Sequence, residues 1–346
     1  MPPLALVAID PSQFPEKARR DLLDSLRTRQ VNPKFHYDTV KQTVLWLALH
    51  RAYSPSRTDS DCAAIYDRSF TAVTAHVAAA KVHLIGLGCG GGQKDTRLLK
   101  LLQNAGKEVS YIPSDVSVSM VLVARQEALT VISDAQCVPF VCDLAAAEDL
   151  PSTLDHLCDR AGGGCSRGAH PASRLFTFFG MIPNFEPEVI MPRLSSLMRP
   201  GDFLLFSANL APGADYAAGV RTILPLYDNA LTRDWLMTFL LDLGVGAPDG
   251  DLRFVIEAAP AGSGLLRIVA YFHFKQARKL SLDGGTFEFT AGEAIRLFFS
   301  YRHTPRLVGE LLARHDLRVL DHWTTQSEEE GVFLCAKRPP ESPTPP

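Results

Sequence analysis

The sequence lacks the features that mark several classes of protein. Its seven cysteines contain no C-x-x-C pair, so the spacing favours neither a zinc site nor a disulfide framework. Thirty-five basic residues stand against 38 acidic ones, and no dense Lys/Arg run offers a surface for nucleic acid. No stretch reaches about 18 uninterrupted apolar residues, and the first residues lack the basic and apolar regions of a signal peptide. We therefore expect a cytoplasmic protein with no metal, nucleic-acid or membrane partner.

Short apolar runs alternate with helical stretches between residues 82 and 208. Runs this short and this apolar are typical of a parallel sheet that is covered on both faces, which predicts an α/β fold. They are "VHLIGLG", "VSYIPSD", "CVPFVCD", "RLFTFFG" and "DFLLFSA". The crossover "AGGGCSRGAH" at 161–170 reads as a flexible loop.

The alternation stops after Ala208, which indicates a second domain. One or two helices are followed by antiparallel strands with turns at Gly262-Ser263-Gly264 and Gly284-Gly285. A helix and two final strands then precede a Pro-rich tail that we expect to be disordered. Apolar residues at helical spacing also predict N-terminal helices over 14–30 and 39–52.

The stretch "LIGLGCGGGQKD" at 84–95 follows a predicted strand and precedes a predicted helix. Such a turn brings backbone N–H groups and the positive end of a helix dipole to one point. Gly86-x-Gly88-x-x-Gly91 fits a dinucleotide fingerprint, whereas Gly88-x-Gly90-x-Gly92 fits S-adenosylmethionine (SAM) methyltransferases. A tight turn without a ligand is the third possibility.

The ends of the next two predicted strands narrow the choice of ligand. Asp115 follows Gly88 by 27 residues, where a carboxylate can accept hydrogen bonds from a ribose, and Asp143 ends the third strand, where an adenine would lie. Each could instead be a helix cap. The final hairpin favours SAM, because the methyltransferase version of this fold closes with one.

These segments resemble the histidine-specific, SAM-dependent Nα-methyltransferases of ergothioneine biosynthesis and their relatives that act on prenylated tryptophan. The resemblance covers roughly residues 33–337. The family's "ELGSGSGEKT" corresponds to "GLGCGGGQKDT", "PVDVS" to "PSDVS", "DF" to Asp143-Leu144 and "GTIGN" to "GMIPN". Its "FYD", "YYPTR" and "YDD" correspond to "FHYD", "AYSPSR" and "LYDN".

The resemblance implies a Rossmann-like class I methyltransferase fold with an inserted α+β substrate domain. Residues 1–60 are then an N-terminal helical segment that contributes to the substrate domain, and 61–208 are the SAM-binding domain. Residues 209–300 are the inserted substrate domain, 301–338 return to the SAM-binding domain, and 339–346 are the tail. The implied SAM-binding residues are Gly88, Gly90, Gly92, Lys94, Asp115, Asp143 and Leu144. The implied substrate residues are Tyr53, Asn184, Tyr227, Ala270, Phe298 and Ser300, with Tyr37 as a catalytic residue that bonds to the amine.

The departures from the family concern the substrate most. Gly86 replaces an acidic residue, and Leu144 replaces a phenylalanine. The family's "IRTEIS" supplies a glutamate and a serine that recognise imidazole, whereas "IRLFFS" has Phe298 in place of the glutamate and retains Ser300. A phenyl ring cannot pair with imidazole as a carboxylate does.

We therefore expect N-methylation of the α-amino group of an amino acid or derivative with an apolar or aromatic side chain, as in secondary metabolism, by a monomer. No Ser-His-Asp or paired-carboxylate apparatus is evident, and methyl transfer requires none. The alternatives are O-methyl or non-methyl transfer from SAM, and a non-catalytic SAM-binding or NAD-binding module.

Overall fold

A computed structural model describes residues 4–54, 58–162, 172–260 and 263–338 of the chain. The predicted loop at 161–170 lies largely outside these ranges, as does Gly262 of one predicted turn, and the predicted disordered tail lies wholly outside them. No helix in the described ranges has the length and apolarity needed to cross a membrane.

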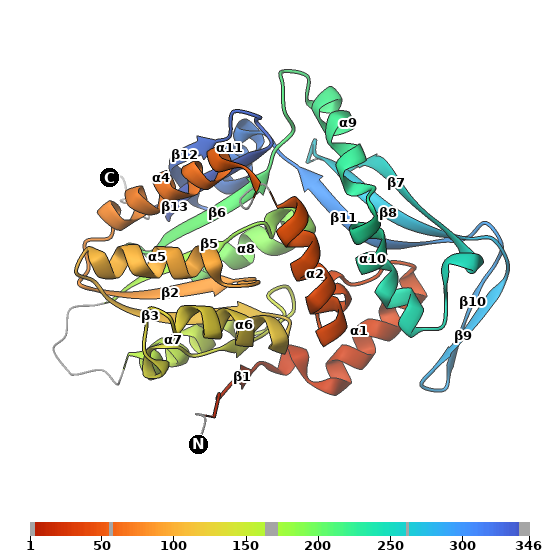
Figure 1. Ribbon diagram of the computed structural model, residues 1–346, viewed down its shortest axis with the longest axis horizontal. Helices are drawn as coiled ribbons and strands as arrows, with labels where there is room; N and C mark the ends of the chain where they lie inside the picture. Colours follow the sequence, from red (N-terminus) through yellow and green to blue (C-terminus); the bar gives the residue numbers. More distant parts are fainter. Residues whose placement is uncertain (1–3, 55–57, 163–171, 261–262, 339–346) are drawn as a thin grey trace, which may run out of the picture.

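An eight-stranded sheet forms the larger part of the molecule (Figure 1), with the order β1-β4-β3-β2-β5-β6-β13-β12. The strands are parallel except that β13 runs antiparallel to both β6 and β12. The five apolar runs all form strands, although the third one pairs over two residues only. The strands are β1 (Ala8–Ile9), β2 (Lys81–Leu87), β3 (Glu108–Asp115), β4 (Phe140–Val141), β5 (Ser173–Phe178), β6 (Phe203–Asn209), β12 (Leu317–Thr324) and β13 (Glu330–Lys337).

Helices cover both faces of this sheet, as the apolar strands require. One face packs against α4 (Ser60–His76), α5 (Gln93–Asn104) and α6 (Val118–Ala128). The other face packs against α7 (Leu150–Ala161), α8 (Pro187–Leu197) and α11 (Pro305–Ala313). The parallel part of the predicted α/β fold is therefore confirmed.

A smaller antiparallel sheet has the order β11-β8-β7 and lies beside the larger one (Figure 1). Its apolar residues pack against the two helices that precede it in the chain, and a separate two-stranded hairpin projects from its far side. The elements are α9 (Tyr216–Tyr227), α10 (Ala230–Asp242), β7 (Gly250–Ala258), β8 (Leu266–Phe274), β9 (Arg278–Leu282), β10 (Gly285–Phe289) and β11 (Ala294–Arg302).

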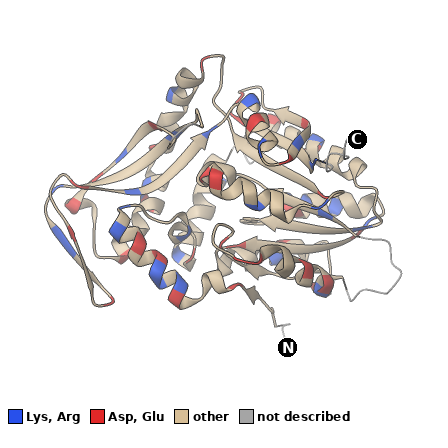
Figure 2. Ribbon diagram, turned by 180° about the vertical axis from the view of Figure 1, so that it is seen from behind, with Lys and Arg blue, Asp and Glu red and all other residues tan. Residues whose placement is uncertain are grey.

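The N-terminal segment reaches both sheets. Helix α1 (Pro15–Thr28) packs its apolar residues into the core of the smaller sheet, and Figure 2 shows basic and acidic residues alternating along it. Helix α2 (Val40–Tyr53) contacts α10 and lies between the two sheets in Figure 1. Its start is fixed by a reciprocal cap, because the Thr39 side chain accepts from Gln42 N and the Gln42 side chain accepts from Thr39 N.

No predicted helix or strand covers α4, β1 or β9. Strand β1 pairs with β4 of the larger sheet, whereas the sequence assigns all of residues 1–60 to the substrate domain. The division of the chain into domains otherwise stays a prediction. Five short 3₁₀ helices complete the described structure: η1 (Pro11–Gln13), η2 (Pro33–His36), η3 (Asp134–Gln136), η4 (Ile182–Asn184) and η5 (Ala247–Asp249).

Candidate active site

A pocket of about 560 Å³ lies where β2, β3 and β5 end, with α2 on its opposite wall. This volume falls within the range of about 300–1,000 Å³ that small-molecule sites have. The pocket brings together many of the residues named from the sequence: Tyr37, Tyr53, Gly88, Gly90, Gly92, Lys94, Asp115, Leu144 and Asn184.

The glycine loop forms one end of the pocket. Gly88, Gly90 and Gly92 all have positive φ, a conformation that side chains rarely adopt. A Cβ on Gly88 would lie 2.6 Å from the Met181 side chain, and one on Gly92 would lie 2.7 Å from the Cα of Ala124. The conformation therefore requires glycine at the three positions of the methyltransferase pattern, whereas Gly91 of the dinucleotide pattern has no positive φ.

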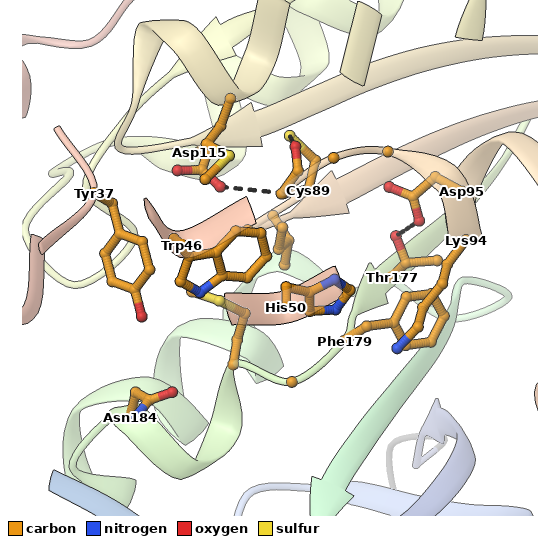
Figure 3. A pocket seen from close by; sticks show the side chains of 18 of the residues that line it. Tyr37, Trp46, His50, Cys89, Lys94, Asp95, Asp115, Thr177, Phe179 and Asn184 are labelled. Atoms are coloured by element: carbon orange, nitrogen blue, oxygen red, sulfur yellow. Dashed lines mark hydrogen bonds between the residues drawn. The ribbon is translucent and has the colours of Figure 1, made fainter. Parts of the chain in front are cut away.

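Asp115 joins the end of β3 to this loop. Its carboxylate accepts hydrogen bonds from Gly90 N at 3.3 Å and from Ser117 N at 3.1 Å, and it faces the pocket (Figure 3). Burial raises the pKa of Asp115 to about 6, and the backbone hydrogen bonds partly offset this rise. The N-cap of α6 is Ser117, so Asp115 does not fill the capping position.

Lys94 lies in the first turn of α5 and lines the same end of the pocket. Its Nζ donates to the Tyr66 hydroxyl at 2.7 Å and lies 3.9 Å from the centre of that ring. The Tyr66 hydroxyl in turn donates to Glu330, which also lines the pocket. A buried carboxylate thus sets the position of the lysine through the tyrosine.

Asp143 is held differently from the other residues expected to bind SAM. Its neighbours Cys142 and Leu144 line the pocket, but Asp143 does not. One carboxylate oxygen accepts from Ala145 N at 2.9 Å, and the other lies 3.7 Å from the Nζ of Lys34. The bond to the residue two positions on is an Asx turn, the kind of local role that the sequence left open.

Tyr37 and Asn184 lie away from the glycine loop, as Figure 3 shows. The Tyr37 ring contacts Trp46 and Trp235, with centres 6.2 and 5.4 Å apart. Burial and the nearby Asp115 raise the pKa of Tyr37, so its phenol stays neutral. Asn184 ends η4, and its Nδ2 donates to the Phe299 carbonyl at 2.8 Å.

The remaining substrate residues do not line the pocket. They form a set behind Trp235, in which Ala270, Phe298 and Ser300 are buried and Tyr227 is half-buried, and the Trp235 ring contacts both Tyr37 and Phe298. Phe298 pairs with Ala270 across β11 and β8 and also contacts the Tyr227 ring. The hydroxyls of Tyr227 and Ser300 share a hydrogen bond of 2.7 Å, and Arg302 donates to the Tyr227 oxygen at 2.8 Å.

Several residues of the pocket were not predicted from the sequence. They come from α2, from α5, from the end of β5 and from the loop that follows it, and Asp95 and Met181 lie inside motifs in which other residues were singled out. They include Trp46, His50, Asp95, Thr177, Phe179 and Met181. Among the residues described, no group of three or more His, Cys, Asp or Glu side chains could hold a metal ion.

The doubly wound sheet with its closing antiparallel hairpin, and the glycine loop and Asp115 at its edge, define a class I SAM-dependent methyltransferase. A sequence profile described as "Histidine-specific methyltransferase, SAM-dependent" matches residues 18–246 and 251–337. The chain belongs to this family.

A relative and two solved structures are also similar to the chain. Histidine N-alpha-methyltransferase of Mycobacterium tuberculosis (strain CDC 1551 / Oshkosh) is 25% identical over 344 residues, covering 92% of this chain and 94% of the relative. A putative methyltransferase of Thermobifida fusca YX has a TM-score of 0.46 and 11% identity, covering 95% and 98% of the two chains. Magnesium protoporphyrin IX methyltransferase of Synechocystis PCC 6803, with bound SAH, has a TM-score of 0.42 and 12% identity, covering 86% and 95%.

Proposed function

We propose that this enzyme methylates the α-amino group of an amino acid, or of a small molecule derived from one, with an apolar or aromatic side chain. The observation that carries the proposal is the packing of Phe298 between Tyr227 and Trp235, at the position where the family has a glutamate. The M. tuberculosis relative and the family are both named for histidine. The present chain differs from the family at Phe298, the position of the glutamate that recognises imidazole.

The charges around the pocket support an uncharged side chain on the substrate. The acidic residues that line it are Asp95, Asp115 and Glu330, and all three contact the glycine loop, helix α5 or the Tyr66–Lys94 pair. The walls near Asn184 are instead Tyr37, Trp46, Met181 and Phe185. An imidazole placed there would lose its water without gaining a carboxylate partner, which disfavours histidine.

The residues present fit SAM. We propose that Asp115 bonds to the ribose, that Leu144 lies at the adenine with Asp143 next to it but outside the pocket lining, and that the glycine loop and Lys94 hold the methionine part. When bound, SAM supplies a methyl group on a positively charged sulfur. The amine lone pair forms the new N–C bond as the S–C bond breaks, so S-adenosylhomocysteine leaves and the amine releases a proton to water.

We propose that Tyr37 and Asn184 orient the amine. A neutral phenol oxygen can accept one amine N–H, and the Asn184 Oδ1 can accept another because Nδ2 is already bonded to Phe299. Both residues hold the amine in a near-attack position, which is the main requirement of this displacement. Neither acts as a base in this proposal.

We propose that the substrate carboxylate binds toward Tyr227, which lies beyond the pocket lining, with Tyr53 at the exposed end of α2 closing the site. Arg302 supports this assignment because its side chain is buried and donates to Tyr227, while no acidic side chain of the described ranges lies within 4 Å of its guanidinium. A buried cation of this kind favours an anionic group nearby.

The test is to incubate the protein with SAM and the free amino acids, histidine included, and to identify every product by mass. We expect one to three methyl groups on an aromatic or apolar amino acid. The matched variant Phe298→Glu restores the family's carboxylate and should lose that activity. Methylated histidine from the unchanged protein would overturn the assignment of Phe298. An O-methyl product would overturn the assignment of the α-amino group as the methyl acceptor.

We also propose a cytoplasmic monomer in secondary metabolism. The six cysteines in the described ranges are free, and five of them are buried, which suits a reducing compartment. Light scattering of the purified protein tests the oligomeric state directly.

A further inference from the structure

Asp95, in the first turn of α5, carries a buried carboxylate to which the proposed function gives no role. Its side chain is 3% exposed and lines the pocket. One oxygen accepts from the Tyr111 hydroxyl at 2.6 Å and the other from Thr177 Oγ1 at 2.8 Å (Figure 3 shows the second bond). Both donors are neutral, and in the described part of the chain no ion pair within 4 Å joins Asp95 to a cationic side chain.

The Asp95 carboxylate occupies the space beside Gly86. A Cβ built on Gly86 would lie 2.3 Å from Asp95 Oδ2 and 3.1 Å from the Tyr111 hydroxyl oxygen. When the family pattern "ELGSGSGEKT" is placed on residues 86–95 without a gap, its glutamate falls on Gly86 and its threonine on Asp95. The two differences are therefore reciprocal, because an acid lost from strand β2 is matched by an acid gained on helix α5 at the same point in space.

We infer that Asp95, whose carboxylate fills the space beside Gly86, binds the ammonium group of SAM. A carboxylate offers about four acceptor positions, of which Tyr111 and Thr177 use two. The pocket that Asp95 lines is formed by the glycine loop, which in this class of enzyme passes beneath the methionine part of SAM. The N-terminus of α5 stabilises the anion through the helix dipole.

The electrostatics of the buried group fit a cationic ligand. Burial raises the pKa of Asp95 to about 6, while the hydrogen bonds from Tyr111 and Thr177 and the charge of Lys94 offset part of the rise. Asp95 is thus ionised at neutral pH, but at a cost that a bound cation would reduce. The ammonium group of Lys94 donates a hydrogen bond to Tyr66 and lowers the pKa of Asp95 through its charge.

Binding of three ligands without any amine substrate tests this inference: SAM, S-adenosylhomocysteine and methylthioadenosine, which lacks the amino-acid part. We expect Asp95→Asn, which keeps the shape of the side chain, to weaken SAM and S-adenosylhomocysteine by about 30-fold. Methylthioadenosine should bind as before. The charge control is Asp242→Asn on the exposed face of α10, which should change none of the three affinities.

The reciprocal exchange tests the spatial argument. Gly86→Glu alone should abolish SAM binding or folding because two carboxylates would occupy one space, and Asp95→Thr alone should weaken SAM as Asp95→Asn does. The double variant Gly86→Glu/Asp95→Thr should recover most of the affinity of the unchanged protein.

Two outcomes would overturn the inference. One is equal weakening of all three ligands in Asp95→Asn, which would show that Asp95 only shapes the loop. The other is a double variant that binds SAM no better than Asp95→Thr. The inference rests on SAM binding and not on the proposed substrate, so a wrong substrate assignment would leave these affinities unchanged.

Discussion

The two ends of the pocket are lined by different kinds of chemical group. The glycine-loop end consists of backbone amides and two carboxylates, half-buried Asp115 bonded to the loop and buried Asp95 bonded to two hydroxyls. The other end consists of aromatic rings, and the set behind Trp235 adds Phe298 and Tyr227. The first is suited to a polar, cationic ligand and the second to an apolar group. Under the proposed function, the cofactor is therefore held by charge and the substrate side chain by shape.

The largest expected effect concerns Asp115, at the polar end of the pocket. Asp115→Ala removes a half-buried carboxylate that we assign to both ribose hydroxyls. Two charge-assisted hydrogen bonds of about 1.5–3 kcal/mol each correspond to at least a 100-fold loss of SAM affinity. Calorimetric titration measures the loss. Asp134→Ala, at an exposed ion pair with Arg125, is the control. Unchanged SAM binding by a folded Asp115→Ala protein would remove the ribose assignment.

The polar end is also the part that could be predicted from the sequence. Gly88, Gly90, Lys94 and Asp115 lie within 28 residues, and the carboxyl ends of parallel strands meet at one edge of a sheet. Once the strands are predicted, these four residues are therefore expected at the same edge of the sheet. Asp95 was missed although it lies in the same stretch, because its carboxylate occupies space that the missing side chain of Gly86 leaves to it, and spacing along the chain does not show this.

The aromatic end could be named only by resemblance. Its residues are spread from Tyr37 to Ser300, and their contacts depend on Trp235, which no motif indicates. A register shift between Arg296 and Phe298 in β11 further decides which residues of "IRLFFS" face the core. Neither feature follows from spacing along the chain, so the separation of Phe298 from the pocket lining was not foreseen.

The second prediction asks whether the two ends act independently. Asn184→Ala should lower kcat by about 50-fold, because a misplaced amine loses its near-attack position, while SAM affinity stays the same. Steady-state kinetics on the substrate found by mass, combined with titration of SAM, separate the two. A parallel loss of SAM affinity would show that Asn184 belongs to the polar end. Asn104→Ala, at the last residue of α5, is the matched control.

The third prediction uses the pKa of Asp95, which burial raises to about 6. Between the ordinary value of 3.8 and about 6, the folded protein holds this proton and the unfolded chain does not, so the free protein gains stability from Asp95 as pH falls through that window. SAM affinity should move the other way, by about tenfold at one pH unit below the pKa, because the cation prefers the ionised group.

Comparison with Asp95→Asn isolates these effects from other titrations. The variant should lose both the gain in Tm between pH 6.5 and 5 and Asp95's share of the fall in SAM affinity. Equal pH dependence in the two proteins, by thermal unfolding and by titration, would contradict the prediction.

The smallest expected effect concerns Tyr37, which lies between the two ends. Its raised pKa keeps the phenol neutral, so the hydroxyl orients the amine without removing its proton. Tyr37→Phe then loses one hydrogen bond of about 1 kcal/mol, which is roughly a fivefold fall in kcat. The pH dependence of kcat should keep its shape, because the amine and not the tyrosine sets it. A general base would behave differently, since its removal costs about 10²- to 10⁴-fold and abolishes one limb of the pH profile. A loss of that size would make Tyr37 part of the chemistry, and the aromatic end would then contribute more than shape.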